Sequence, residues 1–315
     1  VLTDADGQKV FEIDELSTNR RLWKWVCQTK ELGTVRLLRP RIFVMLDDQS
    51  SNLERIWDDL KSTYQNTPPI NNSSEKTATP VITFEIVDGI ATTQKKGHPQ
   101  QWTIDQLNAR IHVNKTGSLE AVKAVGNLAG FGKPGNWQLQ FGPANGKTST
   151  LQTNEINTVA SQQQLILQLT DIPIDAMDPL IKRNLDRSSV SGRLQGKIAA
   201  RWKTGKTSSS YEIEGHLTAT QVTIEDSRLN GDVLQLSQAH LAGNIELLDD
   251  VVSSREILLE TDLGTINVGG TLDLAQLNTM AFLEGILHQQ LQINTIVDVA
   301  ELAAHFPRTL RIRDG

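Results

Sequence analysis

Alternation of apolar and polar residues with a period of two, in one segment after another, most constrains what this chain can fold into. In residues 164–169, for example, Leu165, Leu167 and Leu169 alternate with Gln164, Ile166 and Gln168, of which two are polar. Successive side chains of a strand point to opposite faces, so this pattern gives each strand one apolar and one polar face. Such strands are typical of an antiparallel sheet with one face in water.

The alternating segments recur over most of the chain, whereas sequence with helical spacing is scarce. We predict strands at 33–38, 41–46, 81–87, 102–113, 136–141, 164–169, 194–202, 211–224, 234–247, 257–263 and 265–272. The alternation slips once inside 102–113, between Ile104 and Leu107. Asn145-Gly146 and Asn230-Gly231 are dipeptides expected at hairpin turns that need positive φ.

The predicted helices are short and begin at recognisable caps. One follows Asn19, one opens with the capping-box pattern of Ser51 and Glu54, and one follows Asp178-Pro179. The phrase LDLAQL at 272–277 matches VDVAEL at 297–302, and each copy predicts a strand, an aspartate cap and a helix. A looser copy lies at 174–177, and a final strand is expected from Thr309.

Composition divides the chain at one place. Residues 67–80 are rich in Pro, Asn, Ser and Thr and predict a linker or long loop. We therefore expect a small α/β module at 1–66, the linker at 67–80, and a curved, extended antiparallel sheet with short helices at 81–315. The fold class is mainly β.

Charge, cysteine content and motifs exclude several functions. The net charge of −6 disfavours nucleic-acid binding, and the single cysteine, Cys27, excludes an intrachain disulfide and a cysteine-based zinc site. The six histidines are dispersed, and 141–148 lacks the spacing of a phosphate-binding loop. No run of 18 apolar residues occurs. We expect no enzyme activity, no metal and no cofactor.

Several segments resemble the AsmA/TamB-like proteins of the Gram-negative envelope. The N-terminal module of that family is similar to 32–44 (LGTVRLLRPRIFV) followed by 52–56 (NLERI). A helix-then-strand signature resembles 171–180 (DIPIDAMDPL) followed by 191–196 (SGRLQG). The repeated groove strands are similar to 263–274 (LGTINVGGTLDL).

The resemblance implies a bridge-like lipid-transfer protein, in which phospholipid acyl chains travel along an apolar β-groove between membranes. It implies a periplasmic location, an inner-membrane anchor that these residues do not contain, further repeats after residue 315, and membrane-protein partners at the ends of the groove. The alternating apolar residues are the candidate groove lining. They are Leu165, Leu167, Leu169, Leu194, Ile198, Ile213, Leu217, Leu234, Leu236, Ile257, Leu259, Ile266 and Val268.

Three alternatives remain open from the sequence. The same apolar residues could form the closed core of a β-sandwich. The sheet could instead act as a scaffold in outer-membrane protein assembly, by pairing its edge with a partner strand. A carbohydrate-acting enzyme on a β-sandwich would need two carboxylates about 5 to 10 Å apart in a cleft.

Overall fold

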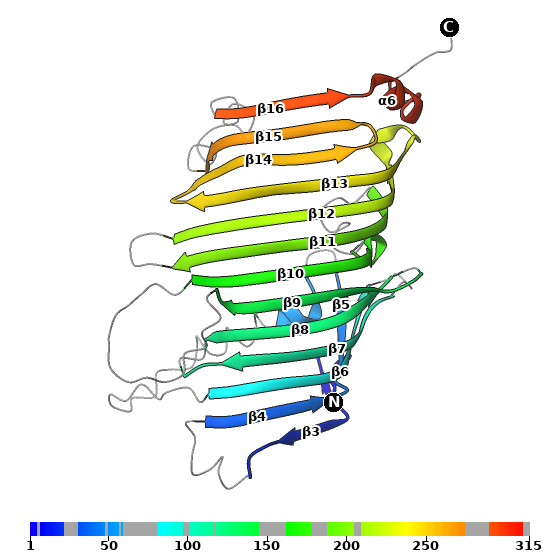
Figure 1. The fold of residues 1–315 in the computed structure, drawn as a ribbon. Helices are drawn as coiled ribbons and strands as arrows, with labels where there is room; N and C mark the ends of the chain where they lie inside the picture. Colours follow the sequence, from blue (N-terminus) through cyan, green and yellow to red (C-terminus); the bar gives the residue numbers. More distant parts are fainter. Residues whose placement is uncertain are drawn as a thin grey trace.

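A computed structural model describes residues 1–4, 7–21, 31–47, 50–56, 58, 81–96, 101–115, 118–130, 132–144, 162–177, 188–204, 209–274 and 290–310. Over these residues the chain forms one large curved sheet of 16 strands that does not close on itself (Figure 1). The strands are β1 (Leu2–Thr3), β2 (Lys9–Glu12), β3 (Glu15–Thr18), β4 (Glu31–Leu38), β5 (Arg41–Leu46), β6 (Val81–Lys95), β7 (Gln101–Val113), β8 (Leu119–Ala129), β9 (Gly135–Pro143), β10 (Gln162–Pro173), β11 (Ser188–Thr204), β12 (Ser209–Asp226), β13 (Val233–Leu248), β14 (Val251–Thr261), β15 (Gly264–Asp273) and β16 (Gln290–Val297). Short helices are η1 (Ile174–Met177), η2 (Ser227–Leu229) and α6 (Val299–His305), and a helical segment begins at Asn52.

From β6 to β16, each strand pairs antiparallel with the next strand along the chain. The N-terminal strands are arranged differently. β4 and β5 follow one another along the same edge of β6, both parallel to it, and Pro40 lies between them. β3 then pairs with β4, and β2 with β5. The strands predicted for residues 1–66 are therefore hydrogen-bonded into the same sheet as those that follow.

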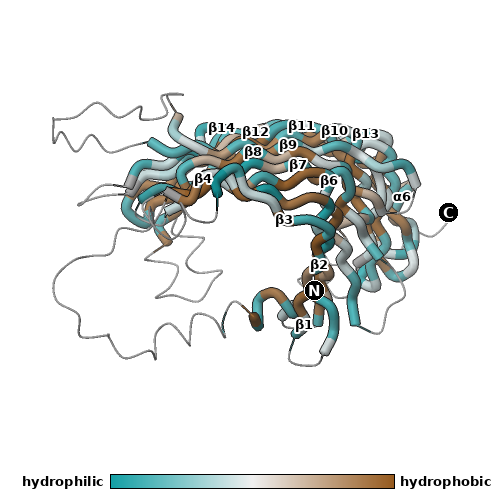
Figure 2. The backbone as a smooth tube through the Cα atoms, turned by 90° about the horizontal axis from the view of Figure 1, so that it is seen from below, coloured by the Kyte–Doolittle hydropathy of each residue, from teal (hydrophilic) through white to brown (hydrophobic). Residues whose placement is uncertain are grey.

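Extra residues with left-handed backbone bend the strands. Asp88, Gln106, Asp171 and Gln221 have φ of 48–55° inside β6, β7, β10 and β12. The pairing register shifts next to the first three, and between Ser191 and Arg193 opposite the fourth. A bulge residue kinks its strand and increases the local twist. Repeated from strand to strand, these kinks turn the sheet into an arch, which Figure 2 shows in cross-section.

Several buried side chains lie beyond this bend. Ile172 is 1% exposed, and Trp102, Val222 and Leu236 are also buried. The indole Nε1 of Trp102 donates a hydrogen bond to the carbonyl oxygen of Asp175 in η1, so η1 covers this end of the sheet. Val35, Ala109 and Ala124 on the near side of the bend are buried as well, so buried residues occur both at the curled end and along the middle of the sheet.

The mainly β, curved and open fold expected from the sequence is confirmed. Differences are local. β8 was not predicted, and β6 continues through Asp88-Gly89, where the sequence indicated that a strand ends. Residues 307–310 form a turn, so no strand starts at Thr309. The linker at 67–80, the helices after Asn19 and Asp178, and the turn at Asn145-Gly146 lie outside the described residues.

Candidate functional site

The concave face of the arch carries three uninterrupted rows of apolar residues that run across the strands. Residues opposite one another in a ladder share a face, so the pairing register defines each row. Row A is Val35, Phe84, Ile111, Val122, Phe141, Leu165, Ala200, Ile213 and Ile245. Row B is Leu37, Ile86, Ala109, Ala124, Leu139, Leu167, Ile198, Gly215, Gly243, Ile257, Val268 and Ile293. Row C is Gly126, Trp137, Leu169, Gly196, Leu217, Leu241, Leu259, Ile266 and Thr295.

Together these rows form the groove. No charged residue occurs in them, and Thr295 is the one hydroxyl. Row B runs from β4 to β16. At a strand spacing of roughly 4.8 Å, that row is about 50 Å long.

Ten of the thirteen predicted lining residues lie in these rows. Leu194, Leu234 and Leu236 do not, because they lie at or beyond the bend. Leu234 pairs with Ile224 and Leu236 with Val222, so these two belong to the curled end, where Leu236 is buried. The lining residues predicted from the sequence did not include the groove residues of β6–β9, nor Leu241 and Ile245 on β13. Most of these residues belong to alternating segments of the same kind.

Most groove side chains are only half-buried. Ile213 is 44% exposed and Ile266 is 39% exposed, although both are large and apolar. No second sheet faces the groove within the described part of the chain, and all its strands belong to one sheet. The described residues therefore do not form the closed β-sandwich core that the sequence left open.

The groove has a pit where two glycines lie side by side. Gly215 and Gly243 are neighbours in row B, and Ile198 and Ile257 flank them on the adjoining strands. The missing side chains leave a pit of about 160 Å³, whose other walls are Ile213, Leu217, Leu241 and Ile245. We call this feature the glycine pit.

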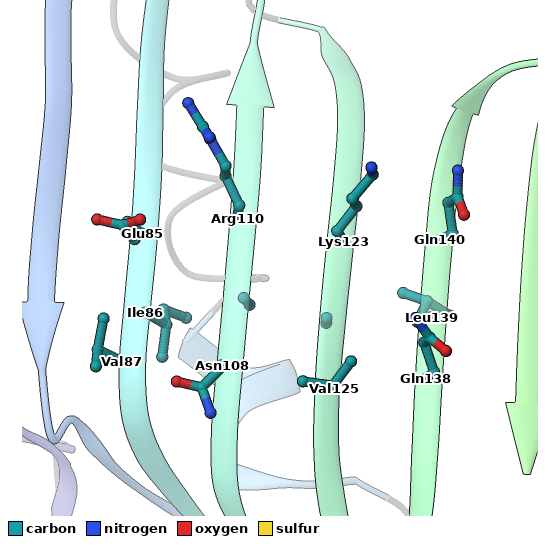
Figure 3. A pocket seen from close by; sticks show the side chains of 12 residues that line it. Glu85, Ile86, Val87, Asn108, Arg110, Lys123, Val125, Gln138, Leu139 and Gln140 are labelled. Carbon is teal, nitrogen blue, oxygen red and sulfur yellow. The ribbon is translucent and has the colours of Figure 1, made fainter. Parts of the chain in front are cut away.

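The convex face has the opposite chemistry. A shallow hollow of about 380 Å³ there is lined by side chains that include Glu85, Arg110, Lys123 and Gln140 (Figure 3). In that view these polar groups lie in front of the strands, and the light-blue helical segment lies behind them. This larger hollow mixes charged and amide side chains with Val87 and Val125, so we place the candidate site on the face whose rows carry no charge.

Polar contacts hold the curled end of the sheet. The Arg193 side chain donates a 2.7 Å hydrogen bond to Asp171, which lowers the pKa of that carboxyl group. The carboxylate of Asp232 accepts hydrogen bonds from the backbone N–H groups of Arg308 (3.3 Å) and Thr309 (2.6 Å). Desolvation of Asp232 acts to raise its pKa, but the hydrogen bonds outweigh it and the pKa is lowered. The two hydrogen bonds to Asp232 attach the turn after α6 to the β12–β13 hairpin.

Nothing in the described residues resembles a metal site or a membrane-spanning helix. Those residues contain no group of three or more His, Cys, Asp or Glu side chains placed to hold a metal ion. No helix among them is both long and apolar enough to cross a bilayer. Comparison with protein-family models, with curated proteins and with solved structures gives no match.

Proposed function

We propose that this protein binds phospholipid acyl chains along the groove and conducts them from one end of the sheet to the other, without catalysing a reaction. The observation that carries the proposal is the set of three apolar rows that cross the concave face while their side chains stay half-exposed. An exposed apolar surface of this size is costly in water and marks an interaction site. Each methylene buried against it contributes about 0.8 kcal/mol.

The length of the groove favours conduction over storage of a single lipid. One leaflet of a bilayer has a hydrocarbon depth of about 15 Å, half of the whole core. The groove is several times longer than that, about 50 Å at the usual strand spacing. Because the three rows offer no charged anchor, a chain can move along them without breaking a hydrogen bond to a side chain.

The place of action that we propose is the bacterial periplasm, with membrane proteins as partners at the ends of the groove. The support for this part is the resemblance to AsmA/TamB-like proteins in segments 32–44, 52–56, 171–180, 191–196 and 263–274.

The direct test is lipid extraction and native mass spectrometry of the purified protein and of groove variants. Ile213→Asp and Ile266→Asp place a charge at positions that solvent already reaches, so the fold should persist while bound phospholipid is lost. His216→Asp is the matched control, because the exposed His216 lies on the other face of β12, next to Gly215. Loss of lipid in His216→Asp as well as in the groove variants, or no lipid in the parent protein, would contradict the proposal.

Sheet-edge pairing in outer-membrane protein assembly is a second candidate, supported by β16. Within the described residues β16 pairs only with β15, and it has no charged residue along its eight positions. Ile293 is 63% exposed and Ile296 is 75% exposed. Natural edge strands are usually protected by charges, proline or bulges. Ile296→Lys should abolish the binding of a partner β-strand to the edge of β16 and leave the amount of bound lipid unchanged. Unchanged strand binding together with a loss of lipid would exclude this candidate.

A further inference from the structure

The rim of the groove is not uniform beside the glycine pit. One step outward from row A, a rim row follows the strand ends: Ile82, Val113 and Leu119, and, farther along, Pro143, Gln163, Trp202, Tyr211, Leu247, Val252 and Leu272. Only Gln163, Trp202 and Tyr211 in this row carry polar side-chain atoms, and they lie on the adjacent strands β10, β11 and β12. The glycine pit is centred on β12 and β13.

These three side chains combine apolar surface with polar atoms. Trp202 stacks on Phe141 of row A with ring centroids 5.8 Å apart, which places its indole on the concave face. Tyr211, directly opposite Trp202, is 42% exposed. Gln163 has a buried Oε1 without a hydrogen-bond partner. Tryptophan and tyrosine gather where hydrocarbon meets polar headgroups, because each has an apolar ring and one polar atom.

The distance between rim and pit fits one lipid. Tyr211, Ile213, Gly215 and Leu217 lie on one face of β12, and the six steps from Tyr211 to Leu217 span about 20 Å at roughly 3.4 Å per residue. The acyl region of one leaflet is about 15 Å deep. A lipid with its headgroup at Tyr211 would therefore place the ends of its chains over the pit.

The size and chemistry of the pit also favour a hydrocarbon occupant. The side chains around the pit are all apolar, and its volume of about 160 Å³ leaves room for the end of an acyl chain. Water gains little in such a space because it finds no polar partners. The pit is too small for a folded protein segment.

We infer that the juxtaposition of the Gln163–Trp202–Tyr211 rim with the Gly215–Gly243 pit makes a lipid station, where a phospholipid lies across the groove, parallel to β11–β13. Its headgroup faces the rim and its chain ends fill the pit. This inference rests on the proposed function and deepens it, because it assigns one position and one orientation to a bound lipid.

The test uses two photoactivatable phosphatidylethanolamines in phosphatidylcholine vesicles, one with a diazirine at the end of an acyl chain and one with a diazirine on the amine. After illumination, peptide mass spectrometry locates the cross-links. The chain-end probe should label the pit walls, above all Leu217 and Leu241. The headgroup probe should label the rim at Trp202 and Tyr211.

Two variants make the test sharper. A Cβ at Gly215 would lie 3.4 Å from the carbonyl oxygen of Lys197 and 3.5 Å from the side chain of Ile198, which are ordinary contacts, so we use Gly215→Val to fill the pit. We expect it to lower chain-end labelling of Leu241 about tenfold and to leave total lipid binding largely intact. His216→Val adds the same side chain on the other face of the same strand and should change nothing. Circular dichroism checks that both variants keep the sheet.

The outcomes separate the station from the proposed function. Labelling spread evenly along row B, or a headgroup probe that labels the curled end at Val222 and Leu236, would overturn the station and leave lipid binding in place. Unchanged labelling of Leu241 in Gly215→Val would also overturn it. If neither probe labels the protein, the station and the proposed function both fail.

Discussion

Truncation of one isoleucine in the curled end and one in the groove tests whether the groove is open in solution. Ile172 is 1% exposed and lies beyond the bend, whereas Ile213 is 44% exposed in row A. Both lie in strands, so the loss of β propensity is shared by Ile172→Ala and Ile213→Ala. The difference between the two variants therefore reports on burial.

The expected magnitudes differ clearly. Truncation of a fully buried isoleucine removes its transfer free energy and leaves a cavity, together about 2–5 kcal/mol. Ile213 has lost only part of its surface to burial and leaves no enclosed cavity, so Ile213→Ala should cost about 1 kcal/mol. We expect Ile172→Ala to lower the free energy of unfolding by roughly 2 kcal/mol more than Ile213→Ala does.

Urea unfolding of delipidated protein, followed by far-ultraviolet circular dichroism, measures both values. Bound lipid at 100 times its dissociation constant adds about 2.7 kcal/mol to the stability of a protein with one site. The parent protein should gain this stabilisation when phospholipid is added, and Ile213→Ala should gain less. Equal costs for Ile172→Ala and Ile213→Ala without lipid would refute the reasoning, because Ile213 would then be sealed by the protein itself.

Three further perturbations test the parts of the fold that support the groove. The pKa of Asp232 is lower in the folded protein than the usual value of about 3.9, so its stabilising contribution is complete above that pH and is lost as the pH falls through the folded pKa. The protection factors of 299–310, which compare the observed hydrogen-exchange rates with the intrinsic rates at the same pH, should therefore fall in acid, and also in Asp232→Asn at neutral pH. The protection factors of β7 should not change in Asp232→Asn. Gly196→Ala should prevent formation of a stable sheet, because Gly196 has φ 145° and an added Cβ would overlap the carbonyl oxygen of His216. We expect gel filtration of this variant to yield no folded protein. Ser51→Ala should cost about 1 kcal/mol of local stability, read as faster exchange at 52–56, because the Oγ of Ser51 accepts a 3.1 Å hydrogen bond from the backbone N–H of Glu54. Unchanged exchange in Asp232→Asn or Ser51→Ala, or a folded Gly196→Ala, would contradict the role given to that residue.

Local features marked by caps and turns were predictable from the sequence. Ser51 and Glu54 bond to each other's backbone N–H groups as the capping-box pattern indicates, at 3.1 and 2.6 Å. Asp298 caps α6, and Asn230-Gly231 adopts positive φ before β13. In each case the cap or turn depends only on residues within three positions of each other, so a short stretch of sequence is enough to predict it.

Strand pairing and curvature were harder to predict from the sequence. β8 has small residues, Ala124 and Gly126, where the next strand β9 has Leu139 and Trp137, so its alternation is weak. The parallel pairing of β4 and β5 with β6 depends on contacts between distant segments. The residues with positive φ at the bend are Asp or Gln, which occupy that region less often than glycine does. Their type alone does not mark a kink.

The bulges and the hydrophobic pattern are nevertheless coupled. One extra residue in a strand moves every later side chain to the other face, so the apolar positions must change parity at the same point if the inner face is to stay apolar. In β7 the alternation slips between Ile104 and Leu107, and Gln106 is the residue with positive φ. In β12 the apolar positions change from odd to even numbers, from Leu217 to Val222, around Gln221.

This coupling explains why the groove extends around the bend. A strand that kept strict alternation through its kink would turn polar side chains into the curled end and apolar side chains out to solvent. The parity change instead places Val222 and Leu236 in the buried curled end. Sequence slips of this kind therefore carry structural information: in a chain of alternating strands, a slip at the same level of successive strands predicts a bend, and the face that stays apolar on both sides of the slip is the concave one.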